Sequence, residues 1–349
     1  MLRPSRVVLA SAAAALVLAG CSGADPDDDA AVEVGTAAYA FEWLVEQVGG
    51  ERVAVTNVTP PGADAHSLEL APAQVVDLEQ ADLVVHLPQY QAAMDDAVGQ
   101  LGEGAVLDAA GPTEPLAPEE LAEQGGDDAH DHDDEDEGHD HSHADAADDH
   151  AADDHSHDAE GHDHSDHGAA DDHAGHDHGA LDPHVWLDPE RMIALAETVA
   201  DRLTEIDPDG ADAYADGLDA VVADLEDLRE QIADRLGSCS VETVVVGHQA
   251  YGYLLAPHGF VETGLAGIDG GTEVSPARIA ELSALVEESG ATAIYRDANA
   301  PDDAVRAVAE QTGADVQVLD PLEIAPADGD YRDAMQANID ALATGQQCG

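Results

Sequence analysis

The sequence predicts an α/β protein of two lobes, each with a mostly parallel sheet flanked by helices, joined by one long helix. Short apolar segments alternate with helical segments in both halves of the chain, which is the pattern of parallel sheets. One helical pattern, on the order of 40 Å long, separates the two halves. About 270 residues remain once the N-terminal segment and a His-rich insert are set aside, which is enough for two compact domains.

The first lobe is expected over residues 32–207. Its predicted strands lie at residues 31–36, 52–58, 83–87 and 105–108. Its predicted helices lie at residues 39–48, 72–80 and 89–101. The segment 52–58 is rich in β-branched residues, and 83–87 is a short apolar run of the kind that is buried in parallel sheets.

The linking helix is expected over residues 208–236. Apolar residues recur there at steps of four, three, four, three and four, at Tyr214, Leu218, Val221, Leu225, Leu228 and Ile232. Asp207-Pro208 provides a start signal and Gly237 a stop signal. A coiled-coil oligomer helix would show the same stripe. A strut between two lobes fits better, because the segment lies where one α/β pattern ends and the next begins.

The second lobe is expected over residues 237–349. Its predicted strands lie at residues 242–246, 260–265, 291–295 and 315–319. Its predicted helices lie at residues 250–256, 276–288, 302–311 and 331–342. The element order matches that of the first lobe, and the two halves share no sequence repeat.

The N-terminus has the pattern of an export signal over residues 1–20. Arg3 and Arg6 precede an apolar run at residues 7–19 that is too short to span a membrane comfortably. The run ends in Leu-Ala-Gly-Cys21, which resembles the bacterial lipobox, whose Cys becomes lipid-modified. An ordinary secretory signal with a chance Cys is the alternative. The lipobox implies an extracytoplasmic protein anchored to the cell membrane, with residues 21–31 as its tether.

Charge and cysteine content narrow the class of protein further. Eleven Arg and no Lys stand against seventy-six Asp and Glu, so nucleic acid is not an expected partner. Cys239 and Cys348 are an even pair in an exported chain and therefore a disulfide candidate. Two free thiols, or thiols that serve a metal, are the alternatives.

The insert at residues 127–178 consists almost entirely of His, Asp, Ala and Gly. Neutral imidazole is a common metal ligand, so the insert predicts many loose, overlapping metal sites. Its fourteen His residues are His130, His132, His139, His141, His143, His150, His155, His157, His162, His164, His167, His173, His176 and His178. An acidic insert with incidental His is the alternative.

A tight metal site requires ligands that the fold holds at fixed positions, and four residues outside the insert are candidates for such ligands. They follow predicted strands or flank the insert: His66, His184, His248 and Asp320. Ligands bind at the carboxyl ends of strands in open α/β sheets, and zinc takes nitrogen and carboxylate oxygen in tetrahedral geometry. These residues come from both halves, so they describe a site closed by two lobes. We expect His86 to be a buried, hydrogen-bonded residue and His258 to be solvated.

The same residues carry a resemblance to a known family. The motifs are Pro-Pro-Gly-Ala-Asp-x-His66-x-x-Glu, Asp-Pro-His184-x-Trp-Leu-Asp-Pro, Gly-His248-x-Ala-Tyr-Gly-Tyr-Leu and Leu-Asp320-Pro-Leu. In this order they resemble the zinc-type solute-binding lipoproteins of metal ABC transporters, from about residue 32 to the end of the chain. The resemblance implies a metal in the cleft between two lobes. It assigns the three His residues as ligands and Asp320 as a fourth ligand or near neighbour.

The resemblance also predicts the function and the metal. Manganese-type relatives place a carboxylate where His248 stands, and an added imidazole suits zinc better. We therefore expect a monomer that catalyses no reaction, captures Zn²⁺ and delivers it to the permease subunit of an ABC transporter. A surface zinc buffer or adhesin is an alternative. A zinc hydrolase is another, although no His-Glu-x-x-His pair occurs in the sequence.

Overall fold

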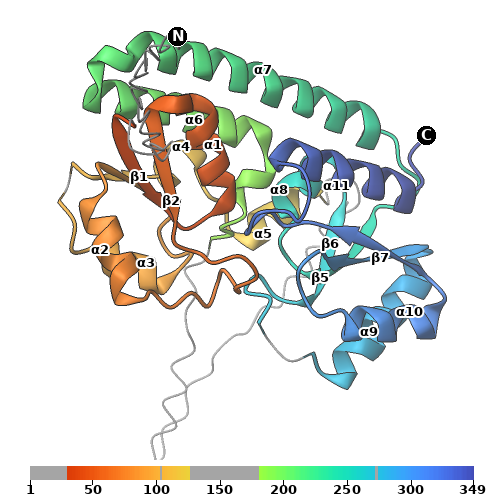
Figure 1. Ribbon diagram of the computed structural model, residues 1–349. Coiled ribbons are helices and arrows are strands. Elements are labelled where there is room, and N and C mark those ends of the chain that lie inside the picture. Colours follow the sequence, from red (N-terminus) through yellow and green to blue (C-terminus); the bar gives the residue numbers. More distant parts are fainter. Residues whose placement is uncertain (1–29, 103, 126–180, 272–273) are drawn as a thin grey trace, which may run out of the picture.

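The computed structural model describes residues 30–102, 104–125, 181–271 and 274–349, which form two α/β lobes (Figure 1). Each lobe contains one four-stranded sheet in which all paired strands are parallel. With the long linking helix, the two sheets confirm the predicted fold class. The predictions for residues 1–29 and for the insert at 127–178 fall outside the described residues. The lobe boundaries stay predictions.

The sheet of the first lobe has the strand order β2-β1-β3-β4. Its strands are β1 (Val32–Thr36), β2 (Val53–Asn57), β3 (Leu83–His86) and β4 (Val106–Asp108). Its helices are α1 (Tyr39–Gly49), α2 (Pro72–Gln80), α3 (Ala92–Val98), α4 (Ala110–Thr113), α5 (Pro118–Gly125) and α6 (Pro189–Ile206). Strand β2 lies on one side of β1 and β3 on the other, so the strand order reverses at β1. Ligands bind outside the carboxyl ends of strands at such a switch point.

The sheet of the second lobe repeats this topology with the order β6-β5-β7-β8. Its strands are β5 (Thr243–His248), β6 (Val261–Ala266), β7 (Ala293–Asp297) and β8 (Asp315–Leu319). Its helices are α8 (Gly252–Leu255), α9 (Pro276–Ser289), α10 (Asp303–Thr312) and α11 (Tyr331–Gly345). Single turns of 3-10 helix lie at η2 (Gly50–Arg52), η3 (Val185–Leu187), η4 (Pro208–Gly210) and η5 (Ala256–His258).

Four predicted helices, expected from residues 89, 208, 250 and 302, begin one to three residues later in the structure. Local geometry explains the first two. The helix expected at 89–101 is reduced to α3, because Gln89 has a left-handed backbone with φ of 68° and Gln91 is extended. The linking helix α7 (Ala211–Leu236) starts after the η4 turn, which Asp207-Pro208 initiates. The short helices α4 and α5 had not been predicted, and no bounds had been predicted for α6.

Helix α7 lies across both lobes, as Figure 1 shows. It packs on α1 and α6 of the first lobe and on α11 of the second. Its predicted apolar stripe is buried, with Leu218 partly so. Gly217 allows the close approach to α1, because a Cβ at this position would collide with the carbonyl oxygen of Val48. Arg332 on α11 contacts the middle of α7 through an ion pair of 2.7 Å with Asp224.

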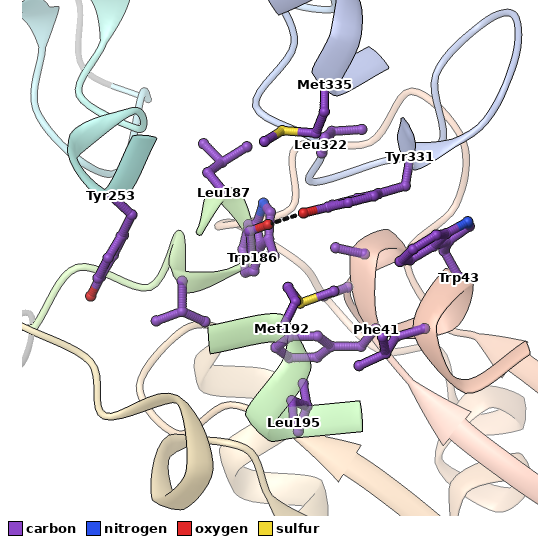
Figure 2. Packing of buried hydrophobic residues seen from close by; sticks show 14 of the residues in the cluster. Phe41, Trp43, Trp186, Leu187, Met192, Leu195, Tyr253, Leu322, Tyr331 and Met335 are labelled. Carbon is purple, nitrogen blue, oxygen red and sulfur yellow. Dashed lines mark hydrogen bonds between the residues drawn. The ribbon is translucent and has the colours of Figure 1, made fainter. Parts of the chain in front are cut away.

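One hydrophobic cluster runs without a break through both lobes (Figure 2). Trp43 of α1 stacks on Tyr331 of α11, with ring centroids 4.4 Å apart. The hydroxyl of Tyr331 donates a hydrogen bond of 2.5 Å to the backbone oxygen of Trp186. Trp186 is fully buried and donates its indole N–H to the carbonyl oxygen of Pro321 at 2.7 Å. The segment around Trp186 therefore joins the two lobes directly beneath the cleft.

Cys239 and Cys348 form a disulfide, as predicted. The bond ties the segment after α7 to the end of the chain after α11. Because both sulfurs are bonded to each other, neither is a free thiol or a metal ligand. No helix in the described part of the chain combines the length and hydropathy that crossing a bilayer requires.

Candidate metal centre

His66 lies on the loop between β2 and α2, where backbone contacts fix its position. Its backbone N–H donates to the carboxylate of Asp64 at 3.0 Å. The buried amide of Gln91 donates to the carbonyl oxygen of the preceding residue, Ala65, at 2.8 Å. The imidazole ring meets the ring of Tyr90 edge to face at 5.2 Å. These contacts aim the ring into the space between the lobes.

His184 lies at the start of the η3 turn and is fully buried. One oxygen of Asp182 accepts both the backbone N–H of His184 at 2.9 Å and its ring Nδ1 at 2.8 Å. Tyr253 of the second lobe donates its hydroxyl to the backbone oxygen of Asp182 at 2.8 Å. With Nδ1 occupied, only Nε2 of His184 remains to face the cleft.

His248 is the last residue of β5 and is positioned in the same manner. Its Nδ1 lies 3.0 Å from Asp297, the last residue of β7. The hydroxyl of Tyr251 donates to the other oxygen of Asp297 at 2.7 Å. Gly247 makes this close packing possible, because a Cβ there would lie 2.7 Å from the Asp297 carboxylate. The Nε2 of His248 is buried and makes no well-aligned hydrogen bond among the described residues, although a Glu323 oxygen lies 3.3 Å away.

Glu323 supplies a carboxylate at the point where the three imidazoles meet. Its Oε1 lies 3.0 Å from Nε2 of His66, 3.1 Å from that of His184 and 3.3 Å from that of His248. One ligand atom from each of the four residues lies within 4.8 Å of the others. Four atoms placed about 2.0 Å from a zinc ion at tetrahedral corners stand about 3.3 Å apart. The distances from Glu323 to the three imidazoles match this spacing, and the four donors are near enough together to hold one metal ion.

Protonation of the imidazoles balances the charge of these carboxylates in the absence of a metal. Burial lowers the pKa of His184, but Asp182 and Glu323 outweigh burial and raise the pKa to about 9. Burial likewise opposes Asp297 and Glu323 at His248, whose pKa is raised to about 10. Burial alone would raise the pKa of Glu323, but hydrogen bonds from the three imidazoles outweigh burial and hold that pKa well below its ordinary value. A bound cation would replace these protons.

His66, His248 and Glu323 line a cleft of about 860 Å³ between the lobes, and the fully buried His184 lies behind its wall. Its walls include the loop before His66 and the ends of β5, β7 and β8. The ionisable lining residues other than the histidines are all carboxylic acids: Asp64, Asp269, Asp297, Asp303, Asp320 and Glu323. A wall with carboxylates and no lining Arg or Lys favours a cation over an anion.

The structure brings three of the four predicted ligands together and places Glu323, not Asp320, beside them. Asp320 follows β8 and lines the cleft, but its Oδ1 accepts the backbone N–H of Leu322 at 2.9 Å. The chain then turns, and the side chain three residues later points at the imidazoles. The sequence offered one signal for this, a second carboxylate in Leu-Asp-Pro-Leu-Glu. The strand-end rule alone selects the nearer one.

The remaining predicted histidines fall outside this cluster. His86 is buried with its Nε2 2.8 Å from Asp95, as expected. His258 is partly buried in the η5 turn, and burial lowers its pKa, so the prediction of a solvated side chain was wrong. The fourteen histidines of the insert lie outside the described residues. The carboxylates behind His184 and His248 had not been assigned from the sequence.

Two parallel-sheet lobes around a buried cluster of three imidazoles and one carboxylate define a two-lobed metal-binding protein. The family model of ZnuA, the periplasmic component A of the zinc-uptake complex, matches residues 34–345. The chain belongs to this family, whose members are metal-binding transport proteins and not enzymes.

Individual relatives agree on the fold and differ in their metal. The zinc-binding lipoprotein AdcA of Streptococcus pneumoniae is 31% identical over 166 residues, which are 46% of this chain and 33% of that protein. The chain thus matches about a third of the length of this relative. The manganese-binding lipoprotein MntA of Halalkalibacterium halodurans is 23% identical over 341 residues, 95% of each chain. The structure of the laminin-binding protein Lmb of Streptococcus agalactiae superposes with a TM-score of 0.68 at 23% identity, over 90% of this chain and 99% of that one.

Proposed function

We propose that this protein captures Zn²⁺ outside the cytoplasm and delivers it to the permease of an ABC transporter. The observation that carries the proposal is the convergence of three imidazole nitrogens and one carboxylate oxygen within 4.8 Å in the cleft between the lobes. The family is that of a component of a zinc-uptake complex, which supports the permease as partner. The lipobox at Cys21 and the flanking tether support attachment to the membrane surface.

The donor set supports zinc over manganese. Manganese prefers oxygen donors, and imidazole is a better match for zinc. Three of the four donors here are nitrogens, and His248 supplies the third. Both zinc-binding and manganese-binding proteins occur among the relatives, so the argument rests on this donor set and on the His-rich insert.

The four donors also argue against the hydrolase alternative. A catalytic zinc site keeps one position open for water or substrate, whereas a site with four protein donors is closed. Glu323 lies close to all three imidazoles and occupies that fourth position. Such a site suits holding an ion until the lobes or loops move.

The test is a zinc titration by calorimetry on the mature chain, beside a variant with His66, His184 and His248 all replaced by Ala. We expect the variant to lose the tightest binding event and to keep the weak events of the insert. His258→Ala is the matched control, because it removes an imidazole outside the cluster. Unchanged tight binding in the triple variant would refute the site. Manganese binding as tight as zinc binding would refute the choice of metal.

A further inference from the structure

The carboxylate of Glu323 reaches the imidazoles only because the chain before it turns sharply. Leu322 has φ of 59°, in the left-handed region that residues with a Cβ rarely adopt. Leu322 is also fully buried, so its side chain cannot move out to relieve the turn. An unfavourable backbone conformation of this kind persists where surrounding contacts enforce it.

Hydrogen bonds from both lobes enforce this turn. The Asp320 carboxylate accepts the N–H of Leu322 at 2.9 Å, which closes an Asx turn across Pro321. The buried amide of Asn338 on α11 pairs with the backbone of Asp320, accepting its N–H at 2.7 Å and donating to its oxygen at 2.8 Å. From the first lobe, the indole N–H of Trp186 donates to the backbone oxygen of Pro321 at 2.7 Å. The backbone N–H of Tyr39 donates to the backbone oxygen of Glu323 at 3.3 Å.

We propose that Asp320 is a positioning residue, which closes the turn that presents Glu323 to the metal and does not itself bind the ion. The proposal rests on the proposed function, because it concerns the same metal site. Among the described residues, Asp320 is the one side chain that hydrogen-bonds to Leu322 itself. Its role requires an acceptor oxygen at the Oδ1 position and no negative charge. The role of Glu323 requires a carboxylate that donates electrons to the ion. Substitutions that keep the oxygen and remove the charge can therefore distinguish the roles of the two residues.

Asp320→Asn keeps the acceptor oxygen and removes the charge, Asp320→Ala removes both, and Glu323→Gln weakens the donor. In the full chain, zinc affinity is measured by competition with a chelator at less than one equivalent, so that the tightest site fills first. We expect Glu323→Gln and Asp320→Ala each to weaken binding by about 10- to 100-fold, and Asp320→Asn by less than about 3-fold. Asp303→Ala removes another cleft carboxylate that lies outside the turn, and it controls for the loss of charge.

Two further readouts distinguish positioning from direct binding. The double variant Asp320→Ala with Glu323→Gln is expected to bind zinc as Glu323→Gln alone does, because Asp320 acts through Glu323. Co²⁺, used as a spectroscopic substitute for Zn²⁺, reports the coordination geometry through its visible absorption. We expect the Co²⁺ spectrum of Asp320→Asn to match that of the unaltered chain, and that of Asp320→Ala to match that of Glu323→Gln.

A loss of 10-fold or more in Asp320→Asn, or additive losses in the double variant, would overturn the proposal and make Asp320 a ligand. Asp320→Asn retains the turn, so this result can be read even where Asp320→Ala fails to fold. A different outcome marks failure of the proposed function: the triple His variant would then bind zinc as tightly as the unaltered chain.

Discussion

The three histidines of the cluster are held in two different ways. The rings of His184 and His248 each have a carboxylate behind them, Asp182 and Asp297, bonded to Nδ1 at 2.8 and 3.0 Å. The ring of His66 has no such partner behind it in the described part of the chain, and its loop is fixed through the backbone. A carboxylate behind a ligating imidazole fixes its tautomer and makes it a stronger donor. The comparison therefore indicates two strong, rigid donors and one more adaptable donor.

This difference follows from the elements that carry each residue. His248 and Asp297 end two strands that are neighbours in one sheet, so the sheet sets their distance. His184 is two residues from Asp182, in a segment pinned by contacts to the second lobe. His66 lies on the loop between β2 and α2, where contacts with Asp64, Tyr90 and Gln91 fix its position but no helix or strand carries it. The donor on the loop is thus the one whose position can change with the least disturbance of the core.

The largest effect is expected from removing a ring that has a carboxylate behind it. We predict that His184→Ala weakens zinc binding by more than about 100-fold, because it removes a ligand itself. Changing a group that only hydrogen-bonds to a ligand weakens binding by about 10- to 100-fold. His66→Ala is expected to weaken binding less than His184→Ala does. His184→Ala also removes the imidazole partner of the buried Asp182 carboxylate, which destabilises the fold. Chelator competition measures the affinity, and thermal unfolding verifies the fold. Equal losses in the two variants would remove the distinction between the donors.

The second-largest effect is expected in the dependence of zinc binding on pH. Neighbouring carboxylates outweigh burial and raise the pKa of His184 to about 9 and that of His248 to about 10, so we expect both rings to be protonated at neutral pH in the metal-free protein. Zinc binds neutral imidazole, so each ion should displace close to two protons at pH 7. Affinity should rise by up to about 100-fold per pH unit through neutral pH and level off as the pH passes these pKa values. Stability of the metal-free fold should change in the opposite direction, because raised pKa values stabilise it at low pH and that gain is lost at high pH.

Calorimetry in buffers of different ionisation enthalpy counts these protons. His184→Ala should lower the count by about one, since it removes one of the two protonated rings. A count near zero in the unaltered chain would show that the carboxylates do not hold protons on the imidazoles.

The third effect isolates the carboxylates themselves. We predict that Asp182→Asn and Asp297→Asn each weaken zinc binding by about 10- to 100-fold, because an amide behind the imidazole leaves it a weaker donor. Asp64→Asn is the matched control, since Asp64 bonds to the backbone of His66 and not to its ring. We expect it to change the affinity by less than about 3-fold. A control that loses as much as the other two would show that general cleft charge, and not the ring contacts, sets the affinity.

The sequence predicted the lobes and most of the cluster for a physical reason. The local periodicity of apolar residues predicts strands and helices. His66, His184 and His248 could be identified because they lie at the ends of elements or beside the insert. Glu323 was not predicted as a ligand, because its direction depends on a left-handed backbone at Leu322. Asn338 and Trp186, from distant parts of the chain, hold the two residues before it. Asp297 and Asp182 could be seen in the sequence, but their pairing with particular rings depends on strand order and interlobe packing. Contacts between distant segments leave no periodic signal.

The smallest effect on the metal is expected at the disulfide. Cys239 and Cys348 close a loop with a sequence separation of 109 residues. By chain entropy, a loop of this size stabilises the fold by about 5 kcal/mol. We predict that replacing both cysteines with Ser lowers the free energy of unfolding by an amount of that order, measured by denaturant titration.

The same double substitution should leave zinc affinity within about 2-fold, because the bond ties the segment after α7 to the chain end and touches no residue of the cluster. This result would show that a large loss of global stability does not by itself weaken the site. The losses predicted for the ring and carboxylate variants could then be attributed to local positioning. A fall in affinity of 10-fold or more would instead mean that the packing of α11, which carries Asn338 and so holds the turn before Glu323, depends on the disulfide.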